Sequence, residues 1–156
     1  MISLKISGLL LSLALLAGCA TQVVPGMTRE EVVARLGAAP AVVPLPAGSR
    51  YQYSGQPRGQ TAFMVDFDAA GRVTSARQVL NANDFARIGI GQWTRADVER
   101  EFGRPASIDR VASWPNDIMA YRWVEEVDKF FWIYLDRNNV VQRTQQGMEH
   151  PNILND

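Results

Sequence analysis

An internal repeat is the feature of this 156-residue sequence that most restricts its fold. Residues 26–37 recur as residues 91–103, and residues 63–73 recur as residues 131–141. The offset between matching positions drifts only from 66 to 70 residues, which short loop insertions would produce. A nearly fixed period indicates one supersecondary unit that is used twice. We therefore expect the chain to consist of two similar units.

Each repeat opens with residues that cap a helix. Thr28 is a good N-cap, and Glu31 stands three residues later, where it completes a capping box. Thr94 and Asp97 hold the same positions in the second repeat. The glycine that closes each motif favours the left-handed conformation that ends a helix. The sequence therefore predicts a two-turn helix at the start of each repeat.

After each predicted helix, apolar residues alternate with other residues, which is typical of a strand with one buried face. Phe63, Val65 and Phe67 share one face, and Phe131 begins the same pattern in the second repeat. Asn83 is a capping residue that predicts a short extra helix between the repeats. We expect three antiparallel strands per repeat, at residues 50–55, 61–68 and 72–80, and then at 119–125, 130–136 and 140–146. The predicted fold class is α+β, a tandem repeat of a helix(-helix)-three-stranded sheet unit with its helices packed on one sheet face.

The first 18 residues have the anatomy of an export signal. One positive charge at Lys5 precedes an apolar run from Ile6 to Leu16, and small residues follow this run. The run is shorter than the roughly 20 residues that a membrane-spanning helix needs. We therefore expect residues 1–18 to be a signal peptide.

The residues Leu16-Ala17-Gly18-Cys19 resemble the bacterial lipoprotein signal, whose peptidase cuts just before the cysteine. The resemblance implies that Cys19 carries a diacylglycerol thioether and that the new amino terminus receives a third acyl chain, such as palmitate. Two or more acyl chains anchor a protein durably. With Ala20 next, the resemblance favours transport to the outer membrane, where the protein would be lipid-anchored on the periplasmic face. The alternative is an ordinary signal peptide that ends at a chance cysteine.

These signals divide the chain into segments. The predicted order is a signal peptide at 1–18, a lipidated tether at 19–25, a first repeat at 26–80, a second repeat at 81–146, and a flexible tail at 147–156. The tether and the tail are expected to be loose because chain ends usually are.

A run in the second repeat resembles a family of small lipoproteins. The run contains Asn83-Asp84, Arg87-Ile88, Gly91, Thr94 and Asp97-Val98, and it ends in Phe102-Gly103-x-Pro105. Together with the matching copy in the first repeat, it resembles the family of the outer-membrane assembly factor BamE, also called SmpA/OmlA. The resemblance implies a helix-helix-three-strand fold, a tether to the outer membrane, and support for the machine that inserts β-barrel proteins.

The chain departs from that family in two respects. Family members that belong to the assembly machine carry one copy of the unit, whereas this chain carries two, and Trp93 replaces the usual methionine. A tandem arrangement of the unit also resembles the β-lactamase inhibitor protein, whose paired copies form one curved sheet that grips an enzyme. The sequence leaves open whether the two units here share one continuous sheet.

One face of the predicted sheets is a candidate for binding a protein. With the helices on the face of Phe63, the opposite face carries Met64 in the first repeat. In the second repeat it carries Trp132 and Tyr134, beside Arg122 on a neighbouring strand. Large aromatic side chains beside an arginine are typical of protein-binding hot spots. The alternative is that the two sheets pack together and that Trp132 and Tyr134 are core residues.

The composition offers little for catalysis or nucleic-acid binding. The 16 basic residues balance 16 acidic residues, so no basic surface is indicated. His150 is the only histidine and Cys19 is expected to be acylated, which leaves no nucleophile-base pair and no metal-ligand set. We expect no catalytic residue, cofactor, metal or small-molecule substrate.

The function that these features indicate is that of a non-enzymatic outer-membrane lipoprotein. We expect it to contact membrane lipid through acylated Cys19 and to bind a protein of the cell envelope as a scaffold. This role would support the assembly or maintenance of outer-membrane β-barrel proteins. The alternative is a membrane-tethered proteinaceous inhibitor of a periplasmic or secreted hydrolase.

Overall fold

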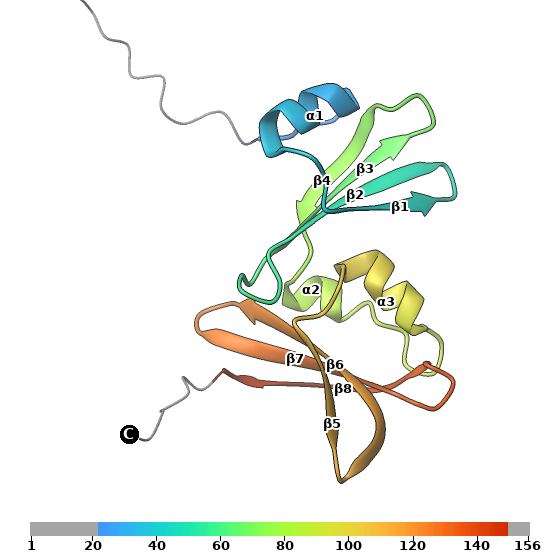
Figure 1. The fold of residues 1–156 in the computed structure, drawn as a ribbon, viewed down its shortest axis with the longest axis vertical. Helices are drawn as coiled ribbons and strands as arrows, with labels where there is room; N and C mark the ends of the chain where they lie inside the picture. Colours follow the sequence, from blue (N-terminus) through green and yellow to red (C-terminus); the bar gives the residue numbers. More distant parts are fainter. Residues whose placement is uncertain (1–21, 150–156) are drawn as a thin grey trace, which may run out of the picture.

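The computed structural model describes residues 22–149, and within this range the chain forms two four-stranded antiparallel sheets and three short helices (Figure 1). This architecture confirms the predicted α+β class. In each sheet the strands are neighbours in chain order, so hairpins make every connection within a sheet. No helix in the described part of the chain is long and apolar enough to span a membrane.

Each sheet follows a helical segment in the chain. The first half consists of α1 (Arg29–Leu36), β1 (Ala41–Leu45), β2 (Gly48–Ser54), β3 (Ala62–Asp68) and β4 (Val73–Gln78). The second half consists of α2 (Ala82–Phe85), α3 (Arg95–Phe102), β5 (Ser107–Val111), β6 (Trp114–Val124), β7 (Asp128–Leu135) and β8 (Val141–Met148). The two sheets are separate and do not form one continuous sheet.

Helix α1 covers one face of the first sheet (Figure 1). The buried cluster beneath it consists of Val23, Val32, Val65, Phe67 and Val73. The segment before the helix also docks here, because the guanidinium of Arg35 donates to the carbonyl of Gln22 at 2.6 Å. The tether predicted at 19–25 therefore packs against α1 from Gln22 onward, instead of remaining loose up to Gly26.

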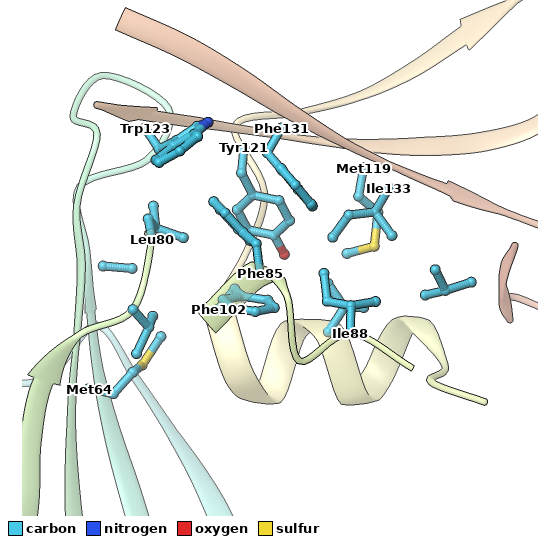
Figure 2. Packing of buried hydrophobic residues seen from close by; sticks show 14 of the residues in the cluster. Met64, Leu80, Phe85, Ile88, Phe102, Met119, Tyr121, Trp123, Phe131 and Ile133 are labelled. Carbon is cyan, nitrogen blue, oxygen red and sulfur yellow. The ribbon is translucent and has the colours of Figure 1, made fainter. Parts of the chain in front are cut away.

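Helices α2 and α3 lie between the two sheets (Figure 1). The larger core takes Ala62 and Met64 from the first sheet, Phe85, Val98 and Phe102 from the helices, and Met119, Tyr121, Trp123, Phe131, Ile133, Leu135 and Val141 from the second sheet. At its centre Phe85 stacks on Phe131, with ring centroids 4.0 Å apart, and meets Trp123 edge-on at 5.5 Å (Figure 2). The layers therefore follow the order α1, first sheet, α2 with α3, and second sheet.

Polar side chains of the first sheet also hold the end of α3. Arg50 donates to the carbonyl of Arg100 at 3.0 Å, and Gln52 donates to the carbonyl of Glu99 at 2.9 Å. The last carbonyls of a helix have no partner within the helix and carry partial negative charge. Arg50 also forms a bidentate pair with Asp66, through contacts of 2.6 and 2.8 Å. The first sheet therefore satisfies the C-terminal end of a helix that belongs to the second half.

The predicted helix caps are present. Thr28 accepts from the amide of Glu31 at 3.2 Å, and the carboxylate of Glu31 accepts from the amide of Thr28 at 2.7 Å. Thr94 and Asp97 form the same reciprocal pair, at 3.3 and 2.8 Å. Both helices end at glycines with positive φ, Gly37 and Gly103. Local sequence therefore determines where α1 and α3 begin and end.

Three expectations about secondary structure are wrong in detail. Each sheet has four strands and not three, because the short edge strands β1 and β5 were missed. Helix α2 begins at Ala82 and is capped by Asn81 instead of Asn83. Strand β8 continues to Met148, so the tail predicted from residue 147 begins as strand. The missed strands lack the alternation of apolar and polar residues that identified their neighbours.

The capping box of α3 predicts a pH-dependent contribution to stability. The hydrogen bond from the Thr94 amide holds the pKa of Asp97 below its ordinary value of 3.8. The ionised carboxylate therefore contributes its full stabilisation above about pH 4 and loses it as the pH falls through the lower folded-state pKa. We expect Asp97→Asn to lower the free energy of unfolding at pH 7 by about 0.5 to 1 kcal/mol.

Urea titrations followed by circular dichroism at several pH values would measure this difference. The gap between the wild type and Asp97→Asn should shrink as the pH falls below 4. A gap that stays constant over the same range would contradict the role of the charge.

Candidate interaction surface

The second sheet has two unlike faces. The alternation of side chains along β6 and β7 turns Tyr121, Phe131 and Ile133 toward the helices, where they join the larger core. The side chains between them lie on the opposite face, as the pairings of Trp132 with Gln145 and of Tyr134 with Arg143 require. We call this opposite surface the aromatic face. Its members are Trp114, Phe130, Trp132, Tyr134 and Arg143.

The rings of the aromatic face pack on one another. Phe130 stacks on Trp132 with centroids 5.6 Å apart, and Trp114 meets Tyr134 edge-on at 5.3 Å. The guanidinium of Arg143 lies 3.9 Å from the centre of the Tyr134 ring, an arrangement that favours a cation-π interaction. These contacts order the face without the help of the helices.

Hydrogen bonds fix the polar groups of two of these rings. The indole nitrogen of Trp114 donates to the carbonyl of Leu135 at 2.8 Å, and the hydroxyl of Tyr134 lies 3.1 Å from the side-chain oxygen of Gln145. A Cβ added at Gly147 would lie 3.0 Å from the Trp132 ring. The glycine therefore lets the indole lie close against β8.

The aromatic face remains open to solvent at its centre. Phe130 and Trp132 are half-buried, whereas Tyr134 is 9% exposed. None of the salt bridges formed within residues 22–149 involves Arg143, so its positive charge is available on this surface. Of the two alternatives for Trp132 and Tyr134, the structure supports neither completely. Both lie outside the larger core, but the side chain of Tyr134 is largely covered by its neighbours.

Met64 is not on a free surface. The prediction placed it on a face directed to solvent, but its side chain is 1% exposed and belongs to the larger core (Figure 2). Its terminal methyl would lie 3.5 Å from a Cβ added at Gly103, where α3 ends. The prediction is wrong because α3 covers the face of β3 that was expected to be open.

Arg122 has an intramolecular role. Its Nε donates to the carboxylate of Glu149 at 2.9 Å, and its Nη1 donates to the carbonyls of Pro57 and Arg58 at 2.9 and 2.8 Å. The side-chain amide of Gln56 bonds both main-chain groups of Arg122, at 2.6 and 3.2 Å. The loop between β2 and β3 is therefore tied to β6 of the second sheet. Arg122 holds the two halves together and presents few free donors to a partner.

Sequence reasoning missed Phe130, Trp114 and Arg143 as members of this surface. Phe130 was recoverable, since it stands two residues before Trp132 and so shares its strand face. Trp114 was not, because β6 begins at Trp114, well before the predicted start at residue 119. Arg143 lies on a strand with no apolar alternation to show which side faces the core.

The described residues gather no evident catalytic group. Within residues 22–149, no three His, Cys, Asp or Glu side chains lie close enough to hold a metal ion. Cys19 and His150 lie outside the described residues. The acidic residues Glu125 and Glu126 lie in the hairpin between β6 and β7, where Lys129 pairs with Glu125 at 2.5 Å.

Comparisons with known proteins add little. No protein-family model matches the chain, and no curated protein matches its sequence. Among solved structures, a DUF4309 family protein, YjgB from Bacillus subtilis, is 12% identical, with 78% of each chain covered and a TM-score of 0.31. A likeness this weak carries no argument about fold or function.

The contacts of Arg122 predict a large loss of stability on its removal. We expect Arg122→Ala to lower the free energy of unfolding by about 1.5 to 3 kcal/mol, because it frees Glu149 and the loop carbonyls of their charged donor. Arg143→Ala is the matched control on the same sheet face and should cost about 1 kcal/mol or less. Urea denaturation of both variants measures the difference. Equal losses would contradict the distinct role of Arg122.

Proposed function

We propose that this chain is a non-enzymatic lipoprotein of the outer membrane that binds a protein partner through the aromatic face. The observation that supports this proposal is a packed group of large rings, open to solvent at Phe130 and Trp132, with the unpaired charge of Arg143 beside them. Aromatic and arginine side chains contribute most of the energy in protein interfaces. In this role the protein supports the assembly or maintenance of outer-membrane β-barrel proteins.

The proposal includes a tandem origin of the two halves, each with its helix on one face of its sheet. Matching hydrogen bonds support this origin. In each half the chain just before the first capping threonine pairs with the first residue of the last strand, which closes the sheet against the helix. The bonds are Gly26 to Val73 at 2.8 Å and Val73 to Met27 at 2.8 Å, and then Gly91 to Val141 at 2.6 Å and Val141 to Trp93 at 2.8 Å.

The layer order explains why only one repeat would bind. By the predicted offset, Trp132 corresponds to Met64 of the first repeat. Met64 lies beneath α3, whereas no layer formed by residues 22–149 covers the face that carries Trp132 (Figure 1). Stacking two units in series covers the outer face of the first and leaves the outer face of the second open.

The position of the chain start supports an orientation. Gln22 binds to Arg35 on α1, at the opposite end of the layers from the second sheet (Figure 1). In the proposed lipoprotein, Cys19 stands three residues before Gln22. An acyl anchor at Cys19 would therefore hold α1 near the membrane and direct the aromatic face away from it, toward proteins of the periplasm.

A photo-crosslinking amino acid in place of Trp132 tests the binding face in intact cells. We expect it to trap a component of the outer-membrane assembly machinery. The same amino acid at Val42, which is 56% exposed on β1, is the control and should not trap that component. Absence of an adduct from position 132, or the same adducts from both positions, would overturn the proposed face. A trapped hydrolase that is inhibited stoichiometrically would favour the inhibitor alternative.

Mass spectrometry of the mature protein tests the anchor. We expect an amino-terminal peptide that begins at Cys19 and carries acyl chains, because two or more chains are needed for durable anchoring. Cys19→Ala should lose the acyl mass and leave the outer-membrane fraction. A mature wild-type chain without acyl groups would contradict the proposal.

A further inference from the structure

We propose that the outer edge of β8 binds an extended segment of another polypeptide as an added strand, with an apolar side chain of that segment in the pocket beside α2. This site is distinct from the aromatic face and does not depend on the lipid anchor. Its evidence consists of open main-chain groups, a pocket at the same edge, and an existing contact that already uses this edge.

The main-chain directions in the second sheet identify the open groups. The amide of Ala106 donates to the carbonyl of Ala120 at 2.8 Å, so Ala120 directs its main chain away from β7. Because antiparallel ladders alternate, Trp132 then exchanges its bonds with Gln145. The main-chain groups of Thr144 and Gln146 therefore point outward. Within residues 22–149, no strand lies beyond β8 in this sheet.

One end of this edge is already paired. Val141 donates to the carbonyl of Trp93 at 2.8 Å and accepts from the amide of Gly91 at 2.6 Å. The segment that contains Gly91 and Trp93 thus runs beside the first residue of β8 before the chain turns into α3. A bound strand would continue along the same edge past Thr144 and Gln146, where this segment has left it.

A pocket of about 310 Å³ lies at the open part of the edge. Its lining residues are Ala82, Phe85, Ala86, Phe131, Thr144, Gln145 and Gln146. The side chains of Thr144 and Gln146 share a sheet face with Phe131, which pairs with Gln146. Residues of an added strand that lie opposite Thr144 and Gln146 would direct their side chains to this same face. The pocket, lined largely by alanine and phenylalanine, would accept a small apolar side chain from that strand.

The edge lacks the usual protection against strand addition. Natural edge strands are often short or carry proline and charged residues. Strand β1 is five residues long and contains Pro44, whereas β8 has eight residues and no proline. Arg143 is the only charged residue of β8, and its guanidinium lies on Tyr134 of the aromatic face.

The chemistry of the pocket selects the occupant. A second copy paired edge to edge through β8 would place the side chains of Thr144 or Gln146 over an apolar pocket. A segment in which every second residue is apolar would fill the pocket and also satisfy the open main-chain groups. The occupant is therefore an unfolded or extended segment of another protein with this alternation.

The test uses the full mature chain in detergent and a fluorescent nine-residue peptide in which valine alternates with threonine and lysine. We expect saturable binding by fluorescence polarisation. Binding should protect the amides of Thr144 and Gln146 from hydrogen exchange. Thr144→Pro should weaken binding by at least about tenfold, because it removes an outward donor without breaking the ladder to β7.

A second variant keeps the test decisive if proline disturbs β8. Ala86 is exposed on the wall of the pocket, so Ala86→Trp should block the pocket and weaken binding by a similar factor. Asn83→Trp is the matched control on exposed α2 and should bind as the wild type does.

Absence of binding, or equal binding by Ala86→Trp and Asn83→Trp, would overturn the proposal. Self-association of the chain that Thr144→Pro abolishes would overturn it in favour of a second copy. The crosslinking result at Trp132 is independent of each of these outcomes.

Discussion

Arg50 is a buried cation whose partners come from both halves of the chain. Its side chain binds Asp66 on the neighbouring strand, the carboxylate of Glu101 at 3.2 Å, and the carbonyl of Arg100 at the end of α3. A buried charge is costly unless each of its donors is satisfied, and removing one partner of such a pair is strongly destabilising. The position of α3 on the first sheet is therefore specified by charge as well as by apolar contact. Without this contact, the face of the first sheet that carries Met64 would be exposed.

The same contact determines which surface remains for function. Two units that each consist of a helix and a sheet can bury four faces only if one unit covers the other. Here the second unit places its helices on the first sheet, while the loop around Gln56 reaches back to Arg122 and reinforces the joint. The outer face of the second sheet is the sheet face left without a covering layer by residues 22–149 (Figure 1). Its aromatic composition contrasts with the polar Arg50 and Asp66 of the covered face.

Local sequence predicted the features that are fixed locally. The capping boxes at Thr28 and Thr94, and the strand around Val65, depend on neighbours a few residues away, and these predictions are confirmed. Strands β1 and β5 were missed because an edge strand is held by one neighbour and needs no apolar alternation. Met64 and Trp132 follow the same sequence pattern, and only the packing of α3 decides which is covered. The role of Arg122 depends on a loop more than 60 residues earlier in the chain, which no local pattern reveals.

The aromatic face and the open edge of β8 meet at one strand. Gln145 and Gly147 lie on the aromatic face, and the Trp132 ring lies against Gly147. Thr144 and Gln146, which alternate with them, line the pocket on the other side. A strand added to β8 would therefore direct half of its side chains into the pocket and the other half beside Trp132. If both proposals hold, they describe two parts of one surface: the edge would select an extended main chain, and the rings would add apolar contact to the same segment.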